Sequence, residues 1–235
     1  ACGGQIQILI EPSTCDHGHW VSQAFDRIEK REQSTLVRVL NLGRESVNSV
    51  ADKRWLTARD SDYGAETGFD QSGEVFFQTF SAQKRVIIIG GVHIAQALVE
   101  SLDSLDFETI IVDPRTVWAN SDRFPNTKIV SAWPEDALTE IGIDKDTAIV
   151  ALTHDPKFDD KAISMGLKSS AFYVGALGGT KSAKARRERL LADGLTSEVI
   201  DTLKTPIGLS IGAKGPAEIA VSVVAQLIQV SRGKT

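Results

Sequence analysis

The chain has 235 residues, of which 42% are hydrophobic and 24% are charged, a composition typical of a folded globular protein. Its formal net charge of -5 excludes general affinity for nucleic acid, so that any anion would need a local site. Only Cys2 and Cys15 are present, and there is no signal peptide or long apolar run, which favours the cytoplasm and argues against a membrane protein. Because the chain begins with Ala1 rather than Met, we expect a missing upstream segment.

The first 83 residues mix strand and helix signals and predict a small α+β domain that is incomplete upstream. Helical periodicity runs over residues 20–30, and the charged, glycine-containing stretch 59–73 is expected to be loop or turn. These residues lack the alternation of apolar strands and amphipathic helices that is typical of a parallel sheet. The expected strands are 5–10, 36–42 and 74–80.

The pattern changes at Lys84, where short β-branched runs begin to alternate with amphipathic helices. This alternation predicts an α/β fold over residues 84–235, with a Rossmann-like doubly wound parallel sheet. The expected strands are 86–89, 109–112, 128–130, 147–152, 171–174 and 207–211. The expected helices are 93–105, 135–141, 157–167, 182–192, 197–203 and 216–230.

The first of these strands runs into Gly90-Gly91-Val92-His93-Ile94-Ala95, which is nearly a dinucleotide fingerprint. Gly90 permits a tight turn, the helix that follows offers N–H groups to phosphate, and Asp113 stands where it could accept a ribose hydroxyl. Val92 replaces the second glycine of the fingerprint, which disfavours ordinary NAD or FAD binding. The alternative is that these glycines only allow close helix–strand packing.

Two further strand ends should face the same crevice, because the carboxyl ends of parallel strands share one edge of a sheet. They carry Thr153-His154-Asp155-Pro156 and Gly175-Ala176-Leu177-Gly178-Gly179. We expect His93, His154 and Asp155 to converge there, where they could position an anion, exchange a proton or touch a metal. Each histidine alone is equally consistent with a capping or hydrogen-bonding role.

Four other segments carry candidate binding groups. The basic stretch 181–189 suits a phosphate, an acidic partner or simply a solvated helix face, and Lys214 precedes a helix start that would leave N–H donors free for an anion. Cys15, Asp16, His17 and His19 match no tetrahedral metal spacing. Cys2, beside two glycines, suits contact with a ligand or sulfur chemistry, although a buried inert thiol is the alternative.

A succession of motifs resembles the xanthine dehydrogenase accessory family (XdhC/CoxI). The motifs are Cys2-Gly3-Gly4-Gln5-Ile6 with Ile10-Glu11-Pro12, the stretch 90–95, Val112-Asp113-Pro114-Arg115, and the stretches 153–159, 173–178 and 206–219. The family usually has glycine at the position of Val92 and a more polar or basic pair at Gly179-Thr180. The resemblance implies a Rossmann domain behind a smaller N-terminal domain, in a homodimeric chaperone. Such a chaperone binds molybdenum cofactor, supports its sulfuration with a cysteine desulfurase, and delivers it to a molybdenum hydroxylase of the xanthine dehydrogenase type.

On this resemblance, the crevice is predicted to protect and transfer the cofactor, and no residue is assigned a catalytic role. Cys2 is expected to approach the molybdenum or its sulfur ligand. The predicted cofactor-binding residues are Gly90, Gly91, His93, Asp113, Arg115, His154, Asp155, Gly175, Gly178 and Lys214, together with Cys2. Two alternatives stay open. One is an NAD(P)- or nucleotide-dependent oxidoreductase with a histidine acid or base, and the other is a regulatory dimerisation module that uses the 216–230 helix or the 181–189 face.

Overall fold

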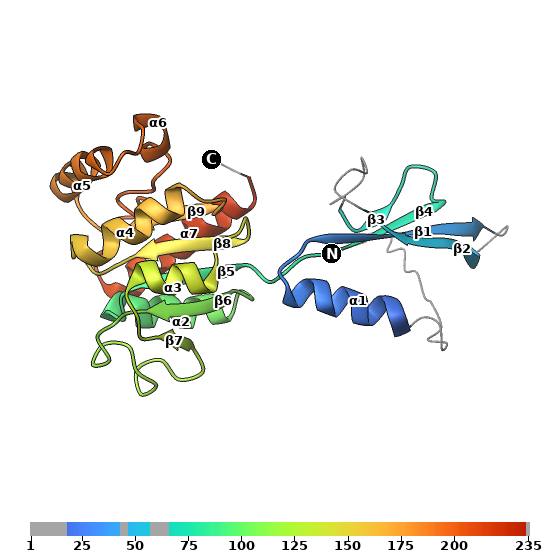
Figure 1. The fold of residues 1–235 in the computed structure, drawn as a ribbon, viewed down its shortest axis with the longest axis horizontal. Helices are drawn as coiled ribbons and strands as arrows, with labels where there is room; N and C mark the ends of the chain where they lie inside the picture. The colour runs from blue at the N-terminus through green and yellow to red at the C-terminus, as the bar shows by residue number, and fades with distance from the viewer. Residues whose placement is uncertain (1–17, 43–46, 57–65, 234–235) are drawn as a thin grey trace. The chain divides into compact units, whose positions relative to one another are not determined.

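The computed structural model describes residues 18–42, 47–56 and 66–233, and its chain divides into two compact units, Ala1–Ala82 and Gln83–Thr235 (Figure 1). Each unit is described by itself. The predicted strand at residues 5–10, together with Cys2, Cys15, Asp16 and His17, lies outside the described residues.

The smaller unit is a helix, α1 (Gly18–Glu29), and an antiparallel sheet in the order β2-β1-β4-β3. The structure confirms the predicted helix and the two predicted strands, here β1 (Ser34–Leu42) and β4 (Val75–Phe80). The edge strand β2 (Val47–Trp55) was not predicted, because its sequence is mostly polar and its pairing with β1 outweighs that weak propensity. The stretch expected to be loop also contains a short strand, β3 (Gly68–Phe69).

Aromatic contacts hold α1 on the sheet of the smaller unit. The rings of Trp20 and Phe80 have centroids 6.2 Å apart, and the indole N–H of Trp55 donates to Gln23 Oε1 at 2.6 Å. The guanidinium of Arg38, which is only 2% exposed, lies 4.8 Å from the Trp20 ring. This cation–π contact lets a charged residue be buried between helix and sheet.

The larger unit is built on a parallel sheet in the order β7-β6-β5-β8-β9. The strands are β5 (Arg85–Ile89), β6 (Glu108–Val112), β7 (Lys128–Val130), β8 (Thr147–Ala151) and β9 (Tyr173–Ala176). The strand order reverses between β5 and β8, which makes the carboxyl ends of these two strands a topological switch point. The structure therefore confirms the predicted Rossmann-like fold.

Helices cover both faces of this sheet (Figure 1). An apolar core lies on each face, as the alternation of side chains along a strand requires. Val86 and Ile88 pack in one core with α2 (His93–Asp103) and α7 (Pro216–Ser231). Ile87 and Ile89 pack in the other, with α3 (Pro134–Ile141) and α4 (Pro156–Leu167). The remaining helices are α5 (Thr180–Ala192) and α6 (Ser197–Ile200).

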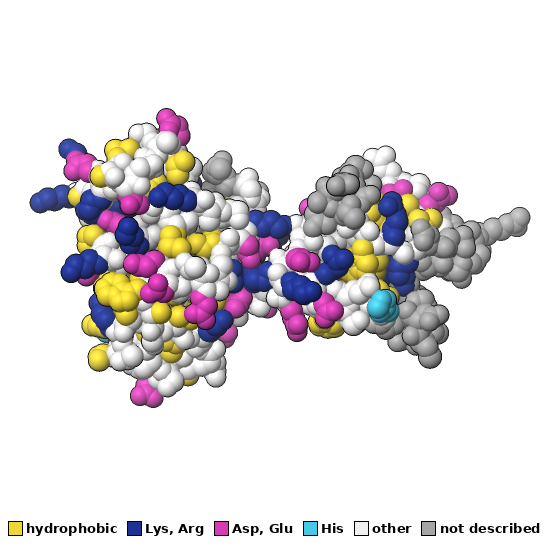
Figure 2. Space-filling view, viewed as in Figure 1, with side chains coloured by type: hydrophobic (Ala, Val, Ile, Leu, Met, Phe, Trp, Pro, Cys, Tyr) yellow, Lys and Arg dark blue, Asp and Glu magenta, His cyan; other side chains and the backbone are white. Residues whose placement is uncertain are grey.

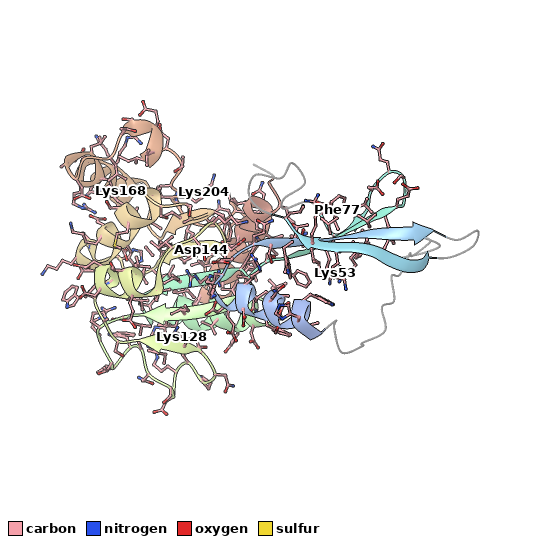
Figure 3. All side chains as sticks on the ribbon, turned by 45° about the vertical axis from the view of Figure 1, so that its right-hand side comes forward. Lys53, Phe77, Lys128, Asp144, Lys168 and Lys204 are labelled. Carbon is pink, nitrogen blue, oxygen red and sulfur yellow. The ribbon has the colours of Figure 1, made fainter. Side chains whose placement is uncertain are left out.

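The prediction of a sixth strand at residues 207–211 is wrong. A single parallel bridge joins Lys204 to Gly175 at the edge of β9 (Lys204 is labelled in Figure 3). Gly208 then has a φ of +90°, which breaks the extended run, and its N–H donates to Gln226 Oε1 of α7 at 2.9 Å. Ile207 packs in the core with α7, the Leu209 N–H donates to the Ser222 carbonyl of α7, and Ile211 is 54% exposed, so the segment forms no strand ladder.

Ion pairs lie at the end of the parallel sheet where its strands begin. Lys84 Nζ lies 3.2 Å from Asp146, and Arg85 Nη2 lies 3.5 Å from Asp144, which Figure 3 labels just before β8. The candidate ligand residues therefore lie at the other edge, where the strands end. Among the described residues, no helix is long and apolar enough to cross a membrane.

Candidate functional site

The glycines at the end of β5 are required by contacts within the protein. Gly90 has a φ of +102°, and a Cβ there would lie 2.5 Å from Thr153 Cγ2 at the end of β8. A Cβ on Gly91 would lie 2.5 Å from the carbonyl oxygen of Trp118. Both close contacts are made by the protein's own chain. Close packing alone therefore explains why these two positions are glycine, without contact to a ligand.

Asp113, at the end of β6, is saturated by donors from the protein. Its Oδ2 accepts from the Gly91 N–H at 3.0 Å and from Arg115 Nη2 at 2.8 Å. Its Oδ1 accepts from the backbone N–H and the Nε of Arg115, both at 2.9 Å. With about four acceptor sites on a carboxylate, Asp113 is already supplied with donors, which disfavours its predicted role as the acceptor of a ribose hydroxyl. It ties the glycine turn to Arg115 instead.

These hydrogen bonds set the charges of the pair. Burial disfavours the charged form of Asp113, which is 1% exposed, but the bonds from Arg115 and Gly91 outweigh it, so the pKa of Asp113 lies below its ordinary value. Hydrogen bonding to Asp113 raises the pKa of Arg115. The result is a fixed, permanently charged guanidinium at the carboxyl edge of the sheet.

Arg115 is the group at this edge best placed to bind an anion. Its side chain is 38% exposed, and its guanidinium lies 5.1 Å from the ring centroid of Phe158 and 5.9 Å from that of Trp118. A planar guanidinium held in one orientation suits bidentate recognition of phosphate or carboxylate.

The first turn of α2 lies next to this arginine and has no side-chain cap, its N-cap being Val92. His93 is exposed, and its ring meets that of Trp118 edge-on at 6.0 Å. Arg123 donates to the carbonyls of Gly91 and Trp118 and so holds the loop after β6 against the turn. The start of this helix therefore offers backbone N–H groups to an anion.

The loop after β8 is organised by one buried carboxylate, Asp159. Asp159 Oδ1 accepts from Thr153 Oγ1 at 2.7 Å, and Oδ2 accepts from the His154 N–H at 3.0 Å. Burial raises the pKa of Asp159, although the hydrogen bonds from Thr153 oppose the shift. These bonds stabilise His154 in a left-handed conformation, with φ +62° and an exposed side chain.

Asp155 acts as the N-cap of α4, since its carboxylate accepts from the Lys157 N–H at 2.9 Å. Its charge also contributes to the raised pKa of Arg115, so β6 and β8 bring these two residues near each other. Arg186, only 4% exposed, lies 3.6 Å from the Asp159 carboxylate and ties α5 to the same loop.

Gly175 is engaged by packing within the protein. It is buried within β9, where a Cβ would lie 2.6 Å from Tyr173 Oη and 2.8 Å from Ile207 Cδ1, so packing explains it. The backbone N–H groups of Lys214 and Gly215, just before α7, donate to Glu218 Oε2 at 2.7 and 3.3 Å, while the ammonium of Lys214 stays a predicted binding group. Gly178, with φ +144°, directly precedes the N-cap of α5.

The prediction missed the aromatic groups at this edge. Trp133, just before α3, stacks on Phe158 with centroids 4.9 Å apart and an interplanar angle of 26°. The sequence does contain a signal for this group, because Trp133 comes soon after a strand and directly before the proline at which a helix begins. Within residues 18–42, 47–56 and 66–233, no group of three or more His, Cys, Asp or Glu side chains is placed to hold a metal ion.

The comparisons with known proteins agree with the Rossmann-like fold of the larger unit. The family model of the XdhC Rossmann domain covers residues 86–227. The chain belongs to the XdhC family. This assignment confirms the resemblance drawn from the motif succession.

Three relatives illustrate the match of this XdhC chain. It is 32% identical over 165 residues to a Bacillus subtilis (strain 168) protein named as a probable xanthine dehydrogenase subunit, covering 70% of this chain and 48% of that protein. It is 28% identical over 105 residues to the molybdenum cofactor insertion chaperone PaoD of Escherichia coli (strain K12), covering 45% of this chain and 32% of that protein. The crystal structure of a xanthine dehydrogenase from Bacillus halodurans matches with a TM-score of 0.73 and 26% identity, over 96% of this chain and 67% of that one. The aligned regions thus span half or less of both curated relatives.

Proposed function

We propose that this chain is an accessory protein that binds molybdenum cofactor, supports its sulfuration with a cysteine desulfurase, and delivers it to a molybdenum hydroxylase of the xanthine dehydrogenase type. The observation that carries the proposal is the fixed cation Arg115, held by Asp113 beside the uncapped start of α2 in an XdhC-family domain. The relative named as a molybdenum cofactor insertion chaperone supports the choice of cargo.

In this proposal, the phosphate of the cofactor binds Arg115 and the first turn of α2. His93 and the loop at His154 and Asp155 supply polar groups around the pterin–phosphate portion, with the backbone at Gly90, Gly91 and Gly178 lining the approach. Cys2 supplies a soft sulfur ligand toward the molybdenum or its sulfur. Lys214, before α7, supplies a companion positive charge, and Gly175 is left out of the proposed site because it is buried within β9.

An NAD(P)-dependent oxidoreductase is less well supported. The carboxylate that would accept the ribose hydroxyls, Asp113, already receives four hydrogen bonds, and Val92 is partly buried against the core at the position of the second fingerprint glycine. Binding of a nicotinamide dinucleotide is therefore a result that would count against the proposed function.

The test measures cofactor retention, and cofactor transfer to an apo-hydroxylase, for variants of the proposed binding residues. Arg115→Ala should weaken cofactor binding about tenfold or more, since a charge-assisted hydrogen bond is lost. Lys128→Ala, an exposed residue at the start of β7 labelled in Figure 3, is the matched control and should leave binding unchanged. If the double variant Cys2→Ala with His93→Ala retained and transferred the cofactor as the wild type does, the assignment of these residues would be abandoned.

We also propose that the chain forms a homodimer. Val221 and Ile228, seven positions apart on α7, are 55% and 38% exposed, which leaves an apolar strip on this helix. Sedimentation equilibrium should give a dimer for the wild type and a monomer for Val221→Glu. A monomeric wild type would reject this part of the proposal.

A further inference from the structure

The loop after β6 presents an exposed apolar side chain at the carboxyl edge of the parallel sheet. Val117 is 80% exposed, the largest value among the exposed large hydrophobic side chains of the described residues. A side chain this exposed projects from the surface, so a molecule that buries it must supply an apolar pocket of its own. Figure 2 shows hydrophobic and basic side chains together at the left margin of the larger unit, where the strands end in Figure 1.

The loop that carries Val117 is held in one conformation by the protein. The Trp118 N–H donates to the Arg115 carbonyl at 2.8 Å, which closes a turn around Val117. Arg123 donates to the Trp118 carbonyl at 2.6 Å, and Phe124, further along the loop, is 2% exposed and packs in the core with α2. Because the loop is already ordered, a partner that binds Val117 loses little affinity to the ordering of this segment.

Aromatic rings and a guanidinium continue this surface along the edge of the sheet. The Arg115 guanidinium lies 5.9 Å from the Trp118 ring centroid and 5.1 Å from that of Phe158, which stacks on the 46% exposed Trp133. Trp and Arg are the residue types that contribute most to protein–protein binding, and contiguous exposed apolar surface marks such interfaces. We call Val117, Trp118 and Trp133 the docking rim.

The docking rim flanks the proposed phosphate site. Arg115 lies two residues before Val117, and the Trp118 ring meets that of His93 in the first turn of α2. A protein that receives the cofactor from Arg115 and α2 therefore has to contact the rim. A second copy of the chain bound here would close the site to that recipient, and the apolar strip on α7 is the surface proposed above for the contact between copies.

We propose that the docking rim is the contact surface for the recipient molybdenum hydroxylase, with Val117 inserted into an apolar pocket of that enzyme. This inference rests on the proposed function, because it takes the cofactor to leave from the site at Arg115. In this arrangement the two proteins face each other across the phosphate site, so that the cofactor passes directly from one to the other.

The test is the affinity of the full chain for xanthine dehydrogenase of the same organism purified without its cofactor, measured by surface plasmon resonance. Val117→Ser should weaken this binding about tenfold or more, because two methyl groups no longer fill the pocket. Val117→Ile keeps an apolar side chain and should bind nearly as the wild type does. Leu105→Ser is the matched control, since Leu105 is 40% exposed after α2, at the opposite edge of the sheet. Equal affinities for the two serine variants would overturn the assignment.

The same variant separates docking from folding and from cofactor binding. Val117→Ser should unfold at the wild-type temperature and bind molybdenum cofactor as the wild type does, while its transfer to the apo-enzyme slows about tenfold or more. A lower unfolding temperature would show that Val117 has a structural role and would reject the proposal. If Val117→Ser instead converted a dimer to a monomer in sedimentation equilibrium, the rim would be a contact between copies, and the assignment to the hydroxylase would be overturned.

The outcomes also distinguish this proposal from the proposed function, because the docking measurement needs no cofactor. If the chain binds molybdenum cofactor but Val117→Ser docks as the wild type does, the docking rim is rejected and the chaperone proposal stands. If Val117→Ser weakens docking but the wild-type chain binds no cofactor, the rim stands as the surface for the enzyme and the cofactor proposal fails.

Discussion

At the scale of single residues, Asp113 is the group whose replacement tests the architecture of the site most simply. Asp113→Asn removes the carboxylate that accepts four hydrogen bonds from Gly91 and Arg115. We expect the free energy of unfolding at pH 7 to fall by about 1–3 kcal/mol, measured by urea denaturation. Asp122→Asn, exposed in the loop after β6, is the control and should change it by less than about 0.5 kcal/mol.

The difference in stability between the wild type and Asp113→Asn should also depend on pH. Since the pKa of Asp113 is lowered in the folded state, its stabilising contribution is present above about pH 4 and is lost as the pH falls through the folded-state pKa. The raised pKa of Asp159 has the opposite effect on the pH dependence of stability. Because Asp159 is present in both proteins, its contribution cancels when their free energies of unfolding are compared. The stability gap between wild type and Asp113→Asn should therefore narrow on acidification. A gap of constant size from pH 7 to pH 3 would show that Asp113 is not held as a carboxylate.

Sequence spacing located Gly90, Gly91 and Asp113 but could not give their partners. Gly91 and Asp113 are contacted by Trp118 and Arg115 of the loop after β6, and Gly90 by Thr153 after β8, and neither approach leaves a periodic signal in the sequence. The stacking of Trp133 on Phe158 was missed for a related reason, because only the packing of α3 beside α4 brings the two rings together.

At the scale of elements, a buried arginine joins α5 to the loop before α4. Arg186→Met would leave Asp159 buried without its cation, and we expect a loss of about 3–5 kcal/mol in the free energy of unfolding. Adding Asp159→Asn should recover part of that loss. Arg187→Met breaks only a surface pair with Asp201 and should cost less than about 1 kcal/mol. Equal losses for the two arginine variants would reject the structural role of Arg186.

The alternation of apolar runs and helices predicted most elements of the larger unit, since each central strand is buried on both faces. Apart from the short strand β3, two segments of the chain were predicted incorrectly. The edge strand β2 carries little β-propensity, and the segment at residues 207–211 has the composition of a strand but bonds to α7. In both cases, tertiary pairing decided the structure, and a single sequence does not encode that pairing locally.

At the scale of the whole molecule, we propose that the division near Gln83 separates two domains that fold independently. Residues 83–235 expressed alone should unfold cooperatively, with the same midpoint as the corresponding transition of the full chain. Calorimetry of both proteins makes this comparison. A fragment that lacks a cooperative transition would show that the larger unit depends on the smaller one.

The ligand that we propose for this XdhC-family chain is molybdenum cofactor and not a nicotinamide dinucleotide. The most direct measurement is anaerobic equilibrium binding of the purified chain to molybdenum cofactor, with NADH as the parallel ligand. We predict saturable binding of the cofactor that weakens about tenfold or more in Arg115→Ala, and no saturable binding of NADH. Saturable binding of NADH without binding of molybdenum cofactor would contradict the account.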